Sequence, residues 1–127
     1  MQNARWASIL RHCGSRADRT GNSPQRWDQV KKLFTYEEAA ALLPSVQELT
    51  QVAVDALDAL PEGATEDHER VVTRWAETVI AMGIEVKGLW LIDFDSGSGY
   101  YCWHHPEESL HFFHGYEEGF GGRVPLQ

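Results

Sequence analysis

Residues 102–118 concentrate the side chains of this chain that can bind a metal ion or move a proton. Four of the six histidines lie in this window, with one of the two cysteines and four glutamates. Imidazole titrates near neutral pH, and thiolate, imidazole and carboxylate groups are common ligands of transition metals. Trp103, Phe112 and Phe113 alternate with the polar groups and would supply dry walls for a site. The polar members are Cys102, His104, His105, Glu107, Glu108, His111, His114, Glu117 and Glu118.

The way this window folds decides which of its polar groups meet. Residues 100–104 and 110–114 are predicted to be two strands joined by a short turn. With a nearly symmetric register, Cys102 and His114 lie on the same face of the hairpin, whereas a slip of one residue would separate them. We expect Cys102 and His114 to approach a common point. Whether Glu107 reaches that point from the turn stays open.

Cys102 and His114, together with either Glu107 or His104, would be an acceptable set of zinc ligands. The sequence contains no paired CxxC or HxxxH signature, so this set depends on the fold alone. Each residue also has a structural alternative. Cys102 would then be a small buried hydrophobe, His114 a hydrogen-bonded core residue, and Glu107 a solvated group at a hairpin tip.

Two helices are predicted ahead of this window. Thr35 and Glu38 have the spacing of a capping box, and apolar residues then recur at helical spacing to residue 60. Pro44 lacks the N–H that an interior helical residue donates, so we expect a short helix over 36–42, a break, and a longer helix over 44–60. A second helix begins near residue 65 and ends before Gly83, which makes an antiparallel helical hairpin.

The periodicity changes after Gly83. Residues 86–94 are rich in β-forming residues and predict one strand, so that with the two strands above they form a three-stranded antiparallel β-meander. The tail over 115–127 is rich in glycine and is expected to be irregular, with Phe120 and Leu126 as its anchors. The predicted fold class is α+β: a helical hairpin packed with a small β-meander and an irregular C-terminal tail.

Charge divides the chain into two parts. Seven basic and two acidic residues give +5 over residues 1–32, whereas four basic and 17 acidic residues give −13 over 33–127. We therefore expect a disordered basic leader ahead of a single domain, and we favour its translation from a misassigned start, with the true chain beginning near Val30. The acidic domain would repel phosphate backbones, so nucleic acid is not an expected partner. No apolar run has the roughly 20 residues of a membrane span, and the few cysteines favour a cytoplasmic setting.

Two stretches of the sequence carry a family resemblance. The first runs Phe34-Thr35-x-Glu37-Glu38-Ala39 and then Leu42-Leu43-Pro44; the second comprises Leu91-Ile92-Asp93-Phe94, Cys102-Trp103, Glu107, His114 and Gly119-Phe120-x-Gly122-Arg123-x-Pro125-Leu126. On these residues, 33–127 resembles the bacterial family known as domain of unknown function 2203. Residues 1–29 have no counterpart in it. The resemblance implies that the recurrent polar positions are Asp93, Cys102, Glu107, His114 and Arg123.

Two functions fit these observations. The slightly favoured one is a non-catalytic interaction protein, which binds a protein partner through the helical hairpin while its polar cluster ties the tail to the sheet. The alternative is a small enzyme or metal-binding protein, in which Cys102 and His114 are ligands or a nucleophile and its base. In that case Glu107 carries a proton, Arg123 holds a small anionic ligand, and Asp93 completes the site. Each of these residues also has a structural interpretation, since Asp93 could cap a turn and Arg123 could clamp Glu117, Glu118 or the chain end.

Overall fold

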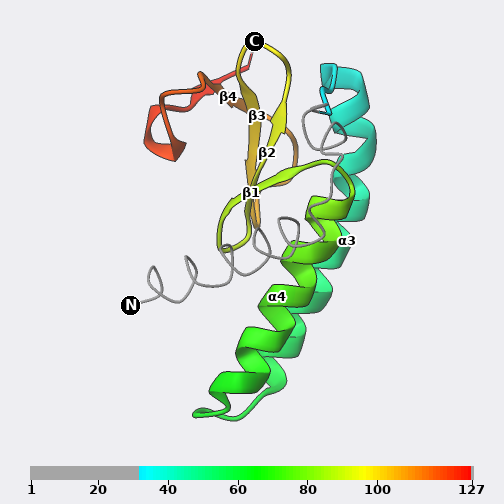
Figure 1. The fold of residues 1–127 in the computed structure, drawn as a ribbon, viewed down its shortest axis with the longest axis vertical. Coiled ribbons are helices and arrows are strands. Elements are labelled where there is room, and N and C mark those ends of the chain that lie inside the picture. The colour runs from blue at the N-terminus through cyan, green and yellow to red at the C-terminus, as the bar shows by residue number, and fades with distance from the viewer. Residues whose placement is uncertain (1–31, 127) are drawn as a thin grey trace, which may run out of the picture. The chain divides into compact units, whose positions relative to one another are not determined.

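The computed structural model describes residues 32–126, which form two helices and a five-stranded antiparallel sheet, so the predicted α+β class is confirmed (Figure 1). The basic leader predicted over 1–32 falls, except for Lys32, outside the described residues. A three-residue 3₁₀ turn lies between β4 and β5. The helices and strands are α3 (Tyr36–Ala59), α4 (Thr65–Ala81), β1 (Glu85–Gly88), β2 (Leu91–Asp95), β3 (Tyr100–His104), β4 (Phe112–His114) and β5 (Val124–Pro125).

Helix α3 begins at the predicted capping box. The backbone N–H of Glu38 donates to Thr35 Oγ1, and the N–H of Thr35 donates back to Glu38 Oε1, both at 3.0 Å. The predicted break at Pro44 is wrong, because α3 continues through it without interruption. Leu43 and Val46 on either side of Pro44 are buried, while Pro44 itself is exposed. Packing of the apolar face therefore outweighs the local cost of the proline.

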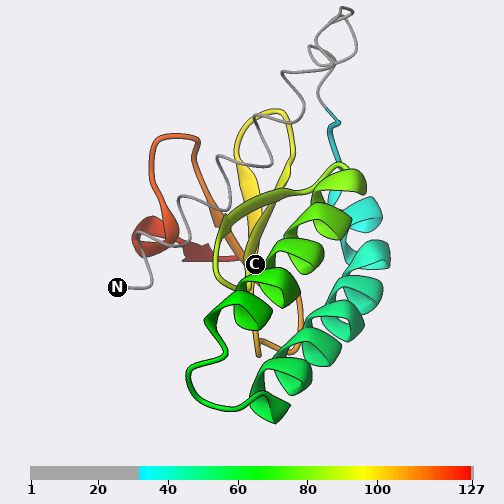
Figure 2. The same cartoon turned by 60° about the horizontal axis from the view of Figure 1, so that its bottom comes forward.

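Helix α4 runs beside α3 and makes the predicted hairpin (Figures 1 and 2). Trp75 is 3% exposed, and its indole N–H donates to Thr50 Oγ1 at 2.8 Å. The Trp75 ring also makes an edge-to-face contact with Trp90, in the turn between β1 and β2, at a centroid distance of 4.8 Å. This tryptophan therefore joins both helices to the turn that follows β1.

The single strand predicted over 86–94 is wrong, because this segment folds as the hairpin β1–β2. Val86 pairs with Ile92, and the chain reverses at Leu89 and Trp90. Trp90 has φ of 60°, a left-handed conformation that non-glycine residues seldom adopt. Two tertiary contacts hold Trp90 in this conformation. Its ring packs against the Trp75 ring, and its carbonyl accepts a hydrogen bond from the backbone N–H of His105 at 3.1 Å. These contacts are long-range, so the strand pattern alone did not reveal the turn.

The sheet has the strand order β1-β2-β3-β4-β5, so the predicted three-stranded meander is extended at both ends. Strand β3 has the predicted bounds, and Tyr100 pairs with His114 and Cys102 with Phe112, as the near-symmetric register required. The tail is not irregular throughout. It adds β5 to the edge of β4, with Val124 opposite Phe113.

The two faces of the sheet differ in chemistry because side chains alternate along each strand. Ile92, Phe94 and Trp103 are almost fully buried in the apolar core. Asp93 and Cys102 are their immediate neighbours in β2 and β3 and therefore lie on the opposite face. Within 32–126, no helix is both long and apolar enough to cross a membrane.

Candidate metal centre

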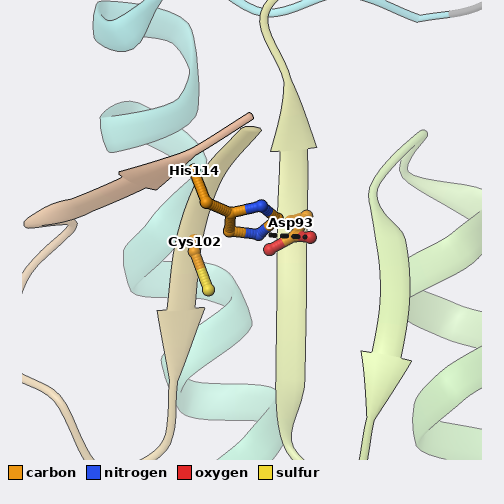
Figure 3. Close-up of side chains that lie close together, drawn as sticks. All are labelled: Asp93, Cys102 and His114. Carbon is orange, nitrogen blue, oxygen red and sulfur yellow. Dashed lines mark hydrogen bonds and ion pairs between the residues drawn. The ribbon is translucent and has the colours of Figure 1, made fainter. Parts of the chain in front are cut away.

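Three adjacent strands each bring one potential metal ligand to the same point. Asp93 on β2 pairs directly with Cys102 on β3, and His114 on β4 lies two residue pairs further along (Figure 3). Their ligand atoms all lie within 4.8 Å of one another. Asp93 and Cys102 are 1% exposed and His114 is 5% exposed, so the cluster is buried. Thiolate, imidazole and carboxylate together form a donor set that suits zinc.

The orientation of the His114 ring is set by the backbone. Its Nδ1 lies 2.8 Å from the carbonyl oxygen of Gly115, which can only accept, so Nδ1 carries the proton. In a neutral ring the lone pair then lies on Nε2, which is 3.0 Å from Asp93 Oδ2. An unprotonated nitrogen and a carboxylate oxygen would repel each other at this distance. A proton or a cation must therefore lie between them.

Asp93 lacks full compensation for its burial. Desolvation raises the pKa of its carboxyl group, and the nearby His114, Cys102 and Lys87 lower the pKa without cancelling that effect. Lys87 Nζ lies 3.7 Å from Asp93 Oδ2 but also pairs with Glu85 at 3.4 Å. Oδ1 of Asp93 is buried and accepts no hydrogen bond from the described residues. A buried carboxylate oxygen without a donor is costly, and it is the kind of atom that a cation would satisfy.

Without a bound metal, Cys102 is a neutral thiol at neutral pH. Burial and the neighbouring Asp93 raise its pKa to about 12, although Arg123 acts in the opposite direction. The Nη1 of Arg123 lies 3.9 Å from the sulfur. A thiol with this pKa is a weak nucleophile at neutral pH, which disfavours the nucleophile and base interpretation of Cys102 and His114. A bound metal would stabilise the thiolate directly.

A pocket of about 330 Å³ adjoins the cluster. Asp93, Cys102 and His114 are all among the residues that line it. Its remaining wall comes from β1, β2 and the loop after β4, and includes Lys87, Leu91, Tyr116 and Phe120. A metal held by three protein ligands would keep a fourth position toward this pocket, which is the arrangement of catalytic rather than structural zinc sites.

Glu107 and Arg123, two of the predicted site residues, form a separate clamp. Arg123 Nη1 and Nη2 donate to the two Glu107 carboxylate oxygens at 3.1 and 2.8 Å. The guanidinium lies over the rings of Phe112 and Phe120, at 3.9 and 4.2 Å from their centroids. Burial alone would raise the pKa of Glu107, but Arg123 and the His104 backbone N–H outweigh it and lower the pKa. Arg123, rather than Phe120 or Leu126 alone, anchors the tail, and its partner is Glu107, not Glu117 or Glu118.

The structure brings together only part of the predicted ligand set. Cys102 and His114 meet as expected, but their third neighbour is Asp93 rather than Glu107 or His104. Both Glu107 oxygens are engaged by Arg123, and the His104 ring packs against Phe120 at 5.5 Å. Burial is the main cause of a lowered pKa at His104.

Lys87 is the residue beside the cluster that the sequence analysis missed. Glu85, Val86 and Lys87 alternate polar, apolar and polar, and Glu85 pairs with Asp93 across β1 and β2. Strand alternation thus puts Lys87 on the same face of the sheet as the cluster. The signal was present, but only recognition of the turn at Trp90 would have brought β1 next to β2.

The model of the uncharacterized conserved protein family DUF2203 matches residues 57–126, more than half of the chain. The chain belongs to the DUF2203 family. All three residues of the cluster, together with Glu107 and Arg123, lie in the matched part of this DUF2203 protein, whereas the opening over residues 34–44 lies outside it. No curated protein and no solved structure matches the chain significantly.

Proposed function

We propose that this DUF2203 protein binds a zinc-like divalent metal ion through Asp93, Cys102 and His114. The observation that carries the proposal is the orientation of the His114 ring. Its Nδ1 lies 2.8 Å from the Gly115 carbonyl oxygen, and this contact directs Nε2 toward Asp93 Oδ2 at 3.0 Å. Metal-binding histidines typically donate their second N–H in this way, which orients the ring and raises its basicity.

Charge and burial support the same proposal. A divalent metal ion would balance the negative charges of the Asp93 carboxylate and a Cys102 thiolate. Both groups have a raised pKa without a metal ion. The ion would also satisfy the unpaired Oδ1 of Asp93 or replace the proton needed at Oδ2. The nearest cationic atoms are Lys87 Nζ, 3.7 Å from Asp93 Oδ2, and Arg123 Nη1, 3.9 Å from Cys102 Sγ. A metal ion would add a positive charge at the point where the three donors converge.

The open pocket suggests what the metal would do. Lys87 and Asp93 both line the pocket, and Lys87 Nζ lies 3.7 Å from Asp93 Oδ2. The fourth coordination position would hold water or a small anionic ligand, and the Lys87 ammonium would favour a negative charge there. Hydrolytic or Lewis-acid chemistry is consistent with such a site, and binding without turnover is equally consistent with it.

Metal analysis tests the proposal directly. The full chain, purified without a histidine tag, is analysed for its elemental content, and about one equivalent of zinc per chain is expected. Substitution with cobalt should give a thiolate-to-metal absorption band if Cys102 is a ligand. Purified protein that holds no metal and takes up neither ion would reject the proposal.

Variants then identify the ligands. Asp93→Asn, Cys102→Ser and His114→Gln should each weaken zinc affinity by more than the roughly 10–100-fold that loss of an outer hydrogen-bond partner costs. His111→Ala is the matched control, because His111 belongs to the same polar window but is exposed. Equal effects of His111→Ala and His114→Gln would indicate nonspecific metal uptake.

A non-catalytic interaction protein is the second candidate function, and the Glu107–Arg123 clamp favours it. The clamp ties the tail to the sheet without requiring any ligand. In this alternative the Asp93–His114 pair shares a proton, and a protein partner binds the helical hairpin. Metal-free protein with a stable fold would favour this function. A bacterial, cytoplasmic setting belongs to both proposals, supported by the family resemblance and the two cysteines.

A further inference from the structure

The outer face of the α3–α4 hairpin contains an apolar groove of about 450 Å³. Gln47 donates to carbonyls of the β3–β4 turn and so marks the side of α3 that faces the sheet. Ala56, nine residues later, lies half a turn around the helix, so the groove faces away from the sheet. The apolar residues that line it are Leu49, Val52, Ala53, Ala56, Leu60, Val71 and Trp75.

The same face carries both a protruding side chain and the hollow that could receive it. Val52 is 63% exposed at the rim, while Trp75 lies 3% exposed in the lining of the groove. A knob and a hole on one surface are what an isologous contact between two identical chains requires, because each copy then fills the other.

The charged residues beside the groove could also pair between two identical chains. Arg70 and Arg74, half of the four basic residues in 33–127, line the groove on α4. Glu48 and Asp55 are exposed on α3, about one turn before and after Val52. Exposed acidic residues of α3 thus flank a groove whose α4 wall contains two arginines and one acidic residue, Asp67. Arg70 pairs with Asp67 within the chain, but both side chains are more than half exposed, so this pair contributes little and can rearrange.

The acidic and basic side chains also lie at matching positions along the helix axes. The hydrogen bond between Trp75 and Thr50 sets the levels of the two antiparallel helices. Asp55 lies five residues after Thr50 in α3, and Arg70 lies five residues before Trp75 in α4. Because the helices are antiparallel, both lie at roughly the same height along the hairpin. A two-fold axis parallel to the helices would keep these heights while placing α3 of one copy over α4 of the other. Acid would then meet base at both edges, whereas stacking α3 on α3 would place acid on acid.

We propose that the groove is the contact surface between two copies of this chain, which pair through their hairpins as a four-helix bundle. Val52 of each copy enters the groove of the other, and Asp55 of each copy meets Arg70 of its partner copy. The sheets, with their candidate metal centres, lie on the two outer sides.

Sedimentation velocity of the full chain tests the proposal, and a concentration-dependent dimer is expected. Val52→Glu should weaken dimerisation by at least about tenfold, because it buries an unpaired charge in the groove. Val124→Glu is the matched control, since Val124 is also exposed, at 54%, but lies on β5. Circular dichroism should show an unchanged fold in both variants. A chain that stays monomeric at every concentration would overturn the proposal and assign the groove to another protein or to an apolar small molecule.

A charge exchange gives a second, independent test. Asp55→Arg and Arg70→Glu should each weaken dimerisation, because each places like charges at both edges. When the two variants are mixed, each edge pairs an acid with a base, and a heterodimer close to wild-type affinity should form. Two weakened variants that fail to associate on mixing would contradict the pairing of Asp55 with Arg70 and overturn the proposed arrangement.

Discussion

At the scale of single residues, the polar residues predicted from the sequence form two separate groups, a buried cluster and an ion pair. Asp93, Cys102 and His114 converge in a buried site, where Asp93 Oδ1 has no hydrogen-bond partner among the described residues. Glu107 and Arg123 satisfy each other with two hydrogen bonds and need no ligand. The buried cluster is suited to binding a metal ion, and the Glu107–Arg123 pair is suited to holding the tail on the sheet. Substitutions in the cluster should therefore change metal binding, whereas substitutions in the pair should change stability.

Cys102→Ser distinguishes a metal ligand from a core residue. Serine is nearly isosteric, so at a metal centre the variant should keep its fold and lose its zinc. If Cys102 only fills space, the substitution leaves a hydroxyl in an apolar position and should cost about 1–3 kcal/mol, with no change in metal content. Urea denaturation and elemental analysis of the same preparations would separate these outcomes.

Glu107→Gln tests the clamp through its pH dependence. Arg123 keeps the folded-state pKa of Glu107 below its usual value, so the carboxylate stabilises the fold above the unfolded-state pKa. We expect the variant to lose about 1–2 kcal/mol near neutral pH. The difference from wild type should shrink as the pH falls through about 4.5 and lower, where Glu107 becomes protonated. Urea denaturation across this pH range measures it.

Glu108→Gln is the control for the clamp, because Glu108 is the exposed neighbour of Glu107. It should leave the free energy of unfolding almost unchanged at every pH. A pH-independent loss in Glu107→Gln would show that the hydrogen-bond geometry, and not the charge, carries the effect.

At the scale of elements, Trp75 joins α3, α4 and the β1–β2 turn. Trp75→Ala should therefore cost about 3–5 kcal/mol, since it leaves a cavity and removes the contact that holds Trp90 in its left-handed conformation. Ile80→Ala on the same helix is the control, because Ile80 is 40% exposed, and it should cost less than about 1 kcal/mol. Thermal denaturation of both variants checks the contrast.

Pro44 is the local defect that α3 tolerates. Pro44→Ala would restore the missing N–H and remove the ring from the preceding turn, so stability should rise by up to about 3 kcal/mol. Chemical denaturation measures the gain. An unchanged or lower stability would mean that α3 accommodates the proline ring without cost.

At the scale of the whole molecule, metal binding should be linked to stability. A ligand that binds only the folded state raises stability with its concentration. Zinc should therefore raise the midpoint of thermal unfolding of the metal-free protein, and a chelator should reverse the change. Asp93→Asn should show neither response, whereas Val52→Glu, on the opposite side of the hairpin from the sheet, should show both. A zinc response that survives in Asp93→Asn would place the ion elsewhere.

The sequence by itself determined the features that depend on local chemistry. The capping box of Thr35 and Glu38 specified where α3 begins, and alternation along β3 put Cys102 on the same face as His114. These features were predictable because neighbouring residues carry the whole signal, through hydrogen bonds one turn apart and through the period of two in a strand.

Tertiary structure alone decided the features that depend on distant residues. Packing on both sides of Pro44 kept α3 continuous, and Trp75 together with His105 held the turn at Trp90. The reversal of the chain at Trp90 brought Lys87 beside Asp93. Asp93 then meets Cys102 and His114 because β2, β3 and β4 pair side by side. No local pattern encodes which distant carboxylate completes a site, because that choice follows from how the strands pack and from the free energy of burying them together.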